Sequence, residues 1–267
     1  MRSALCVGRT MYRLYKICGF IVGCDFHCPT MTARAEKFLL DSAVTDGSTA
    51  PSSGAAPSSG TAPSSGAAPD ISIPYNAAAL AELSARTGLD SDNAEIVYTA
   101  ESFYSALPQR GGFMLHSSAV AVDGRAYLFS APSGTGKSTH TALWLKLFGE
   151  RARILNDDKP AIMLRGGKVT ACGTPWSGKS DLNLNAEFPL QGICILERSP
   201  ENRIAPIPAQ DAVFPLLDQT IRPSDPAGMS ALLSCIDEVT AKVRVWRMGC
   251  NISLEAAQTA YNAMSGG

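Results

Sequence analysis

Two stretches of the chain fit the same phosphate-loop pattern, A/G-x-x-x-x-G-K-S. They are "APSGTGKS" at residues 131–138 and "GTPWSGKS" at residues 173–180. In such a loop the backbone N–H groups of a tight glycine turn wrap the phosphates of a nucleotide, and the following helix adds the positive end of its dipole. This chemistry needs a strand before the loop and a helix after it, so the flanking residues discriminate between the two stretches.

Residues 131–138 meet this requirement. The apolar run at residues 125–130 predicts a strand that leads into the loop, and "THTALWLKLFG" has the apolar spacing of a helix that ends at a glycine. We expect Lys137 to reach the β- and γ-phosphates and Ser138 to bind the metal ion of the nucleotide. The predicted nucleotide-binding residues are Ser133, Gly134, Thr135, Gly136, Lys137, Ser138 and Thr139.

Residues 173–180 do not meet it. A strand, "KVTACG", precedes them, but "DLNLNAEFPL" follows, which alternates and then meets Pro189, so no helix start is available. Pro175 removes a backbone donor, and Trp176 places a bulky ring where a phosphate would lie. We interpret this pattern match as accidental. Two roles stay open for the stretch: a rigid Pro-Trp turn that faces the substrate with Lys179, or a surface hairpin.

A pair of carboxylates follows the predicted helix. Asp157 and Asp158 lie within "ARILNDDKPAIML", twenty positions after Lys137. Paired carboxylates can position Mg²⁺ and deprotonate a hydroxyl nucleophile. The alternative is two turn aspartates before Pro160. We favour the catalytic interpretation, because a strand–helix–strand path returns the pair beside the loop.

The surrounding elements predict an α/β fold with a mixed sheet and flanking helices. Asp123-Gly124 lies between two alternating apolar runs, which is typical of a β-hairpin. The strands expected elsewhere are "DISIPY" and "RVWRMGC". The helices expected are "NAAALAELSART" with Asn76 as its cap, "AQDAVFPLLDQTI", "AGMSALLSCIDEVTAKV", and "SLEAAQTAYNAM" with Ser253 as its cap. In "AEIVYTAESFYSALPQ" we expect a strand and then a short helix ended by Pro108.

A six-residue repeat of Ala, Pro, Ser and Gly fills residues 50–69. It has no large apolar side chain to offset the entropy of ordering, so we expect a mobile tether. The predicted organisation is an N-terminal strand segment at residues 1–44 that docks on the core, a disordered linker insertion at 45–70, and a phosphate-loop kinase core at 71–267. The strand expected in the first segment is "YRLYKICGFIVGC".

Composition excludes several classes of protein. The net charge is −1 and no basic stripe appears, which argues against nucleic-acid binding. No apolar run approaches the roughly 18 to 20 residues of a membrane span. Four of the eight cysteines, residues 172, 194, 235 and 250, sit in or beside apolar runs, which indicates buried thiols of a reducing cytosol. "IVGC" is preceded by too short an apolar run for a lipoprotein signal, and "CDFHC" matches zinc spacing poorly. We expect a cytoplasmic protein.

A hairpin, the loop, one helix and Asp-Asp on the next strand resemble the HPr kinase/phosphorylase and ATP-dependent phosphoenolpyruvate carboxykinase group. Within it, "LHSSAVAVDGRAYLFSAPSGTGKSTHTALW", "LNDDKPAI" and "GTPWSGK" look like the HPr-kinase-related proteins of bacteria. The resemblance spans residues 113 to about 197. It implies the phosphate-loop fold of that group, with ATP and Mg²⁺ as cofactors.

The resemblance also implies an activity and a site. The activity is an ATP-dependent serine kinase acting on a small protein or peptide. The site consists of His116, Lys137, Ser138, Asp157 and Asp158, with Asp157 as base for the target serine and Asp158 helping to hold Mg²⁺. No counterpart of the regulatory N-terminal domain of full HPr kinases is present, nor a clear match to the segment linked to phosphorolysis, so HPr itself is a doubtful substrate.

Two other classes of function stay open. One is a carboxykinase-like enzyme acting on a small metabolite, although nothing here resembles the arginines and lysines that hold oxaloacetate and metal in carboxykinases. The other is a nucleotide-gated binding protein without catalysis, against which the intact Asp157-Asp158 pair argues. The sequence leaves open the phosphoryl acceptor, the preference for ATP or GTP, and whether the chain forms a homo-oligomer.

Overall fold

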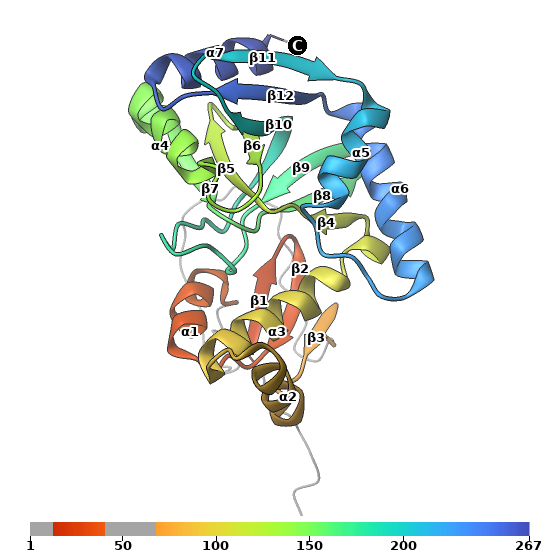
Figure 1. Ribbon diagram of the computed structural model, residues 1–267. Helices are drawn as coiled ribbons and strands as arrows, with labels where there is room; N and C mark the ends of the chain where they lie inside the picture. Colours follow the sequence, from red (N-terminus) through yellow and green to blue (C-terminus); the bar gives the residue numbers. More distant parts are fainter. Residues whose placement is uncertain (1–12, 41–67, 267) are drawn as a thin grey trace, which may run out of the picture.

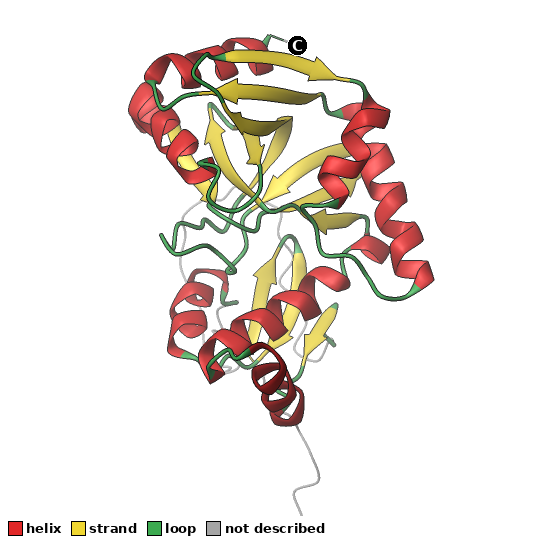
Figure 2. Ribbon diagram, in the orientation of Figure 1, coloured by secondary structure: helices red, strands yellow, loops and turns green. Residues whose placement is uncertain are grey.

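The computed structural model describes residues 13–40 and 68–266, which form a three-stranded and a nine-stranded sheet (Figure 1). Most of the predicted 45–70 linker and the first twelve residues lie outside the described residues. Figure 2 shows the smaller sheet below the larger one, each with its own helices. Among the described residues, no helix has both the length and the apolar character needed to cross a membrane.

The large sheet is mixed. Along one path its strand order is β4-β8-β9-β10-β6-β5-β7, and β12 pairs with both β10 and β11. β6, β10 and β12 are parallel to one another, whereas β5 is antiparallel to both β6 and β7. The strands are β4 (Gly112–Met114), β5 (Ser117–Val122), β6 (Arg125–Ser130), β7 (Ala152–Asn156), β8 (Ala161–Arg165), β9 (Lys168–Cys172), β10 (Glu187–Arg198), β11 (Arg203–Ile207) and β12 (Val245–Cys250).

Helices cover both faces of this sheet, because its central strands are apolar on both sides. On β6, Tyr127 and Phe129 pack in one core with α4 and α7, whereas Ala126 and Leu128 pack in another with α5 and α6. The predicted α/β architecture, a mixed sheet with flanking helices, is confirmed. These helices are α4 (Lys137–Phe148), α5 (Ala209–Leu217), α6 (Pro226–Lys242) and α7 (Leu254–Ser265), with short 3-10 turns η2 (Pro108–Arg110) and η3 (Gly149–Arg151).

The small sheet belongs to a separate layer. β1 (Arg13–Ile17) and β2 (Phe20–Cys24) form a hairpin whose turn residues, Cys18 and Gly19, have φ values of 52° and 78°. β3 (Ile71–Ile73) pairs in parallel with β2, although some fifty residues separate them. The helices of this layer are α1 (Pro29–Ala35), α2 (Ala77–Thr87) and α3 (Ser91–Ser105), with the 3-10 turn η1 (Glu36–Phe38).

The prediction of a strand followed by a short helix before Pro108 is wrong. Residues 91–105 form the single helix α3. The run "IVY" favours a strand locally, but Asp90 caps the helix by accepting from the backbone N–H of Asn93 at 2.8 Å. One face of the helix, including Ala94 and Phe103, is buried. Capping and burial therefore outweigh the β-propensity of a few residues.

Other local predictions are confirmed. Asp123 and Gly124 have φ values of 50° and 76° in the β5–β6 turn, the two left-handed positions that a two-residue hairpin needs. Gly149 ends α4, and Asn76 and Ser253 cap α2 and α7 through their side chains. The β5–β6 hairpin places the start of β5 beside the carboxyl end of β6, because Ser117 pairs with Ser130.

Candidate active site

The 131–138 loop joins β6 to α4, as its pattern predicts. Gly134 and Gly136 have φ values of 78° and 122°, and no atom lies within 4 Å of the position that a Cβ would take. Glycine is therefore required by the backbone torsion angle and not by a lack of space. Lys137 is buried and its Nζ donates to the carbonyl of Ala131 at 2.9 Å, so the side chain folds back over the loop. The first N–H groups of α4 have no partner within the helix. This geometry suits an anion.

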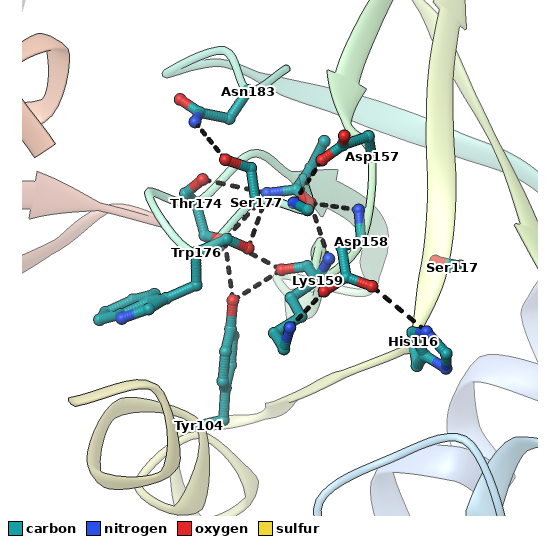
Figure 3. Close-up of polar contacts among 12 residues, drawn as sticks. Tyr104, His116, Ser117, Asp157, Asp158, Lys159, Thr174, Trp176, Ser177 and Asn183 are labelled. Atoms are coloured by element: carbon teal, nitrogen blue, oxygen red, sulfur yellow. Dashed lines mark hydrogen bonds and ion pairs between the residues drawn. The ribbon is translucent and has the colours of Figure 1, made fainter. Parts of the chain in front are cut away.

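Asp158 lies where β5 begins, close to the end of β6. Its Oδ1 is 3.2 Å from Nε2 of His116, and its Oδ2 contacts the ammonium of Lys159 (Figure 3). Burial opposes ionisation, but the hydrogen bond from His116 and the charge of Lys159 hold the pKa of Asp158 well below its usual value. Burial lowers the pKa of Lys137, and Asp158 partly offsets that effect. Asp158 is therefore an ionised carboxylate in the field of Lys137.

His116 has its other ring nitrogen, Nδ1, 2.9 Å from Oε1 of Gln219. Its backbone carbonyl accepts from the hydroxyl of Ser130, the last residue of β6, at 2.9 Å. The histidine is thus tied both to the strand that carries the 131–138 loop and to Asp158. The structure brings together three of the predicted site residues: His116, Lys137 and Asp158.

The carboxylate of Asp157 has other partners than that of Asp158. Its carboxylate accepts from the backbone N–H of Gly178 at 2.6 Å and from the hydroxyl of Ser180. Its own N–H donates to the carbonyl of Leu182 at 3.1 Å. The whole residue is only 5% exposed. The second pattern match, residues 173–180, thus wraps this carboxylate.

The 173–180 loop is followed by irregular chain and then β10, so no helix begins there, as predicted. Burial of Trp176 contradicts the surface-hairpin role for this residue, whereas the role of a turn that faces the substrate with Lys179 stays a prediction. The indole is buried, stacks on Phe103 with ring centroids 4.9 Å apart, and donates from Nε1 to the hydroxyl of Thr99 at 3.0 Å. It anchors the loop on α3, because a large aromatic ring stabilises most when it is fully buried. Lys179 at the tip is exposed.

Two residues of the site, Asn156 and Tyr104, were not predicted from the sequence. Asn156 accepts from the N–H groups of Asp158 and Lys159 and donates to the carbonyl of Thr174 at 3.0 Å, so it connects Asp158 and Lys159 to the second loop. Tyr104 donates to the carbonyl of Lys159. An asparagine directly before a turn is a local signal that could have found Asn156. Tyr104 gives no such signal.

Arg34 of α1 holds the same loop from outside. Its guanidinium donates to the carbonyls of Ser177 and Gly178 at 3.0 and 2.9 Å, and its Nε lies 2.8 Å from Oδ1 of Asp181. Gly178 is also the residue whose N–H contacts Asp157. The small sheet layer is therefore connected to the candidate carboxylate through one residue of the loop.

A family model described as "SynChlorMet cassette protein ScmC" matches residues 80–245. No curated protein matches the chain. Among solved structures, the chain is similar to the Hpr(Ser) kinase/phosphatase from Coxiella burnetii, with 11% sequence identity and a TM-score of 0.32, over 58% of this chain and 99% of that one.

Proposed function

The chain belongs to the family of SynChlorMet cassette protein ScmC, and we propose that it is an ATP-dependent, HPr-kinase-like serine kinase. The acceptor in this proposal is a hydroxyl on a small protein or peptide. One observation carries it: the 131–138 loop, His116 and the Asp157-Asp158 pair meet at neighbouring ends of β6, β5 and β7. Phosphoryl transfer to a hydroxyl needs a loop that holds the phosphates, a group that holds the metal ion and a base for the hydroxyl. The loop and two carboxylates in different environments could supply these three.

The residues fit a nucleotide with Mg²⁺. Ser138 is at the start of α4. Asp158 is ionised, and its negative charge acts on the ammonium of Lys137. One hydroxyl and one carboxylate, completed by phosphate oxygens and water, form the donor set that Mg²⁺ usually takes in nucleotide sites. When bound, Mg²⁺ would neutralise charge on the β- and γ-phosphates. Ser138 and Asp158 would hold it, Lys137 would contact the phosphates, and His116 would orient Asp158.

Asp157 is suited to the role of base. A serine hydroxyl, that of Ser180, already donates to its carboxylate. An acceptor serine that replaced this hydroxyl would have its proton directed at Asp157. In the reaction, the acceptor Oγ forms a bond to the γ-phosphorus, the bond from that phosphorus to the β,γ-bridging oxygen breaks, and the proton passes to Asp157. ADP leaves with the electron pair of the broken bond.

The two loops of equal pattern provide a matched test of nucleotide binding. Lys137→Ala is expected to abolish Mg-ATP binding in calorimetry, because it removes the buried ammonium that folds over the loop. Lys179→Ala, at the same position of the second pattern, should leave the affinity unchanged. Unchanged affinity in Lys137→Ala would refute the site. Loss in Lys179→Ala alone would assign the nucleotide to the other loop.

The carboxylates provide the test of chemistry. Asp157→Asn should leave Mg-ATP affinity intact and reduce transfer about 10²- to 10⁴-fold, the usual contribution of a general base. Asp158→Asn should weaken nucleotide affinity and its dependence on Mg²⁺ together. Transfer is measured from γ-labelled ATP to lone-serine peptides and carrier proteins encoded beside this gene. If neither variant changes transfer while ATP still binds, the kinase assignment fails in favour of a nucleotide-gated binder.

A further inference from the structure

The second phosphate-loop pattern ends in a tight turn. The backbone N–H of Asp181 donates to the carbonyl of Gly178 at 3.1 Å, so Lys179 and Ser180 occupy the two corners of a four-residue turn. Both corner residues are exposed. The hydroxyl of Ser180 nevertheless donates inward, to the carboxylate of Asp157. Ser180 is therefore an exposed serine whose proton is directed at the proposed base.

Contacts from outside the turn hold it in place. Arg34 binds both of its ends, through the carbonyl of Gly178 at 2.9 Å and the carboxylate of Asp181 at 2.8 Å. Just before the turn, the hydroxyl of Ser177 accepts from the amide of Asn183 at 2.8 Å (Figure 3). The backbone of the turn is thus ordered before any reaction, which removes much of the entropic cost of placing the corner hydroxyl beside the base.

The carboxylate of Asp157 has one oxygen that can exchange its partner. Oδ1 accepts from the backbone N–H of Gly178 at 2.6 Å, and Oδ2 accepts from the hydroxyl of Ser180. A Cβ at Gly178 would lie 3.2 Å from both oxygens, so a side chain there would crowd the carboxylate. The N–H is fixed by the course of the backbone, whereas the serine side chain can rotate away. An external acceptor and Ser180 therefore compete for Oδ2.

We propose that the chain phosphorylates its own Ser180 in cis when no external acceptor occupies this position. The inference rests on the proposed function, since ATP must lie on the 131–138 loop and Asp157 must act as the base. The Oγ of Ser180 forms a bond to the γ-phosphorus, and the proton of the hydroxyl passes to Asp157. The bond from that phosphorus to the β,γ-bridging oxygen breaks, and ADP leaves with its electron pair. A hydroxyl fixed beside a base reacts at a high effective concentration.

The product differs from the starting state in charge. A phosphoserine carries about −1.5 to −2 charges at pH 7, and an ionised carboxylate repels it. Once Asp157 has returned its proton to water, phosphorylated Ser180 leaves Oδ2 and turns to the solvent, where the exposed Lys179 is its neighbour in the chain. Oδ2 is then free for the hydroxyl of an external acceptor. The modification therefore removes a competitor from the base.

The test incubates the full chain with Mg-ATP and no acceptor, and locates phosphate by mass spectrometry of peptides. Phosphate is expected on Ser180, at a rate per chain that does not depend on protein concentration. Ser180→Ala should remove it, whereas Ser180→Thr, which keeps a hydroxyl at the exposed corner, should be modified at the substituted position. Asp157→Asn should slow the modification about 10²- to 10⁴-fold without changing Mg-ATP affinity.

Ser177 of the same loop is an internal control. Its hydroxyl donates to Asp181 at 3.0 Å and not to Asp157, so it should stay unmodified in the same digest. No phosphate on Ser180 in a chain that binds Mg-ATP, or phosphate only on serines of residues 50–69, would overturn the inference and leave the proposed function standing. A rate per chain that rises with protein concentration would show transfer between chains and overturn the reaction in cis. Failure of the intact chain to bind Mg-ATP would instead refute the proposed function itself.

Discussion

Arg34 connects the layer of the small sheet to Asp157, the proposed base, through Gly178. The side chain is 10% exposed and makes two hydrogen bonds and one ion pair to the 173–181 region, more than 140 residues away in the chain. Gly178 receives one of these hydrogen bonds and donates its N–H to Asp157. Arg34→Ala should therefore loosen the loop that surrounds Asp157 without touching the 131–138 loop.

The magnitude follows from these contacts. Hydrogen bonds from a charged donor contribute about 1.5–3 kcal/mol each. The carbonyls of Ser177 and Gly178 are part-buried, so water can replace the donor in part, and the low end applies. The ion pair adds at most about 1 kcal/mol, because Asp181 is 56% exposed. Arg34→Ala should lower the free energy of unfolding by about 3 kcal/mol, or the melting temperature by about 6–12 °C.

Two controls sharpen the assay. Arg34→Lys keeps the charge but loses the fork of donors, so it should recover about half of the loss. Lys37→Ala removes a neighbouring cation that donates to the carbonyl of Asn183 at 2.9 Å, which does not contact the carboxylate of Asp157. Denaturant unfolding, Mg-ATP calorimetry and phosphate transfer are measured for all three variants.

Arg34→Ala should reduce transfer at least tenfold more than Lys37→Ala, with Mg-ATP affinity unchanged in both, because only Arg34 acts through Gly178. Wild-type stability in Arg34→Ala would refute the energetic reasoning. Loss of ATP affinity with transfer otherwise intact would refute the coupling to Asp157.

Three further predictions concern other parts of the molecule. Burial lowers the pKa of His140 to about 4 from an unfolded value near 6.5, so the unfolded chain binds the extra proton first. The free energy of unfolding should fall by about 3 kcal/mol from this group as the pH drops from 6.5 to 4, and His140→Gln should remove that part of the slope in urea titrations; identical slopes would contradict it. Ser180→Ala should leave Mg-ATP affinity unchanged and transfer detectable, since an acceptor hydroxyl can replace the one that it removes from Asp157; abolished transfer would give Ser180 a direct role. Deletion of residues 50–69 should preserve soluble expression, because the repeat offers no large apolar side chain to a core, and an insoluble product would show that this boundary is misplaced.

The parts of the site that depend on neighbours in sequence could be predicted. The β5–β6 hairpin, the 131–138 loop with its glycines, and α4 up to Gly149 follow from turn chemistry and apolar spacing within about thirty residues. The distinction between the two loops was also accessible, because it required only the presence or absence of a following helix.

Local preference misled where packing was stronger. The segment that forms α3 contains β-branched residues, and only its cap and buried face make it a helix. Trp176 gave no sign of its environment, since a Pro-Trp turn is compatible with a surface position. Its ring is buried because Phe26, Phe103 and Tyr104 come from other parts of the chain to surround it.

The sequence by itself predicted that Asp157 and Asp158 follow the strand after the loop helix, where a strand–helix–strand path returns them beside the 131–138 loop. Only the tertiary structure decided that the two carboxylates have different partners: His116 and Lys159 for Asp158, Gly178 and Ser180 for Asp157. The link from Arg34 to Gly178 is of the same kind. Adjacent residues share every local pattern, so their separation depends on which distant segments pack against each side, and that is decided by the burial of whole layers.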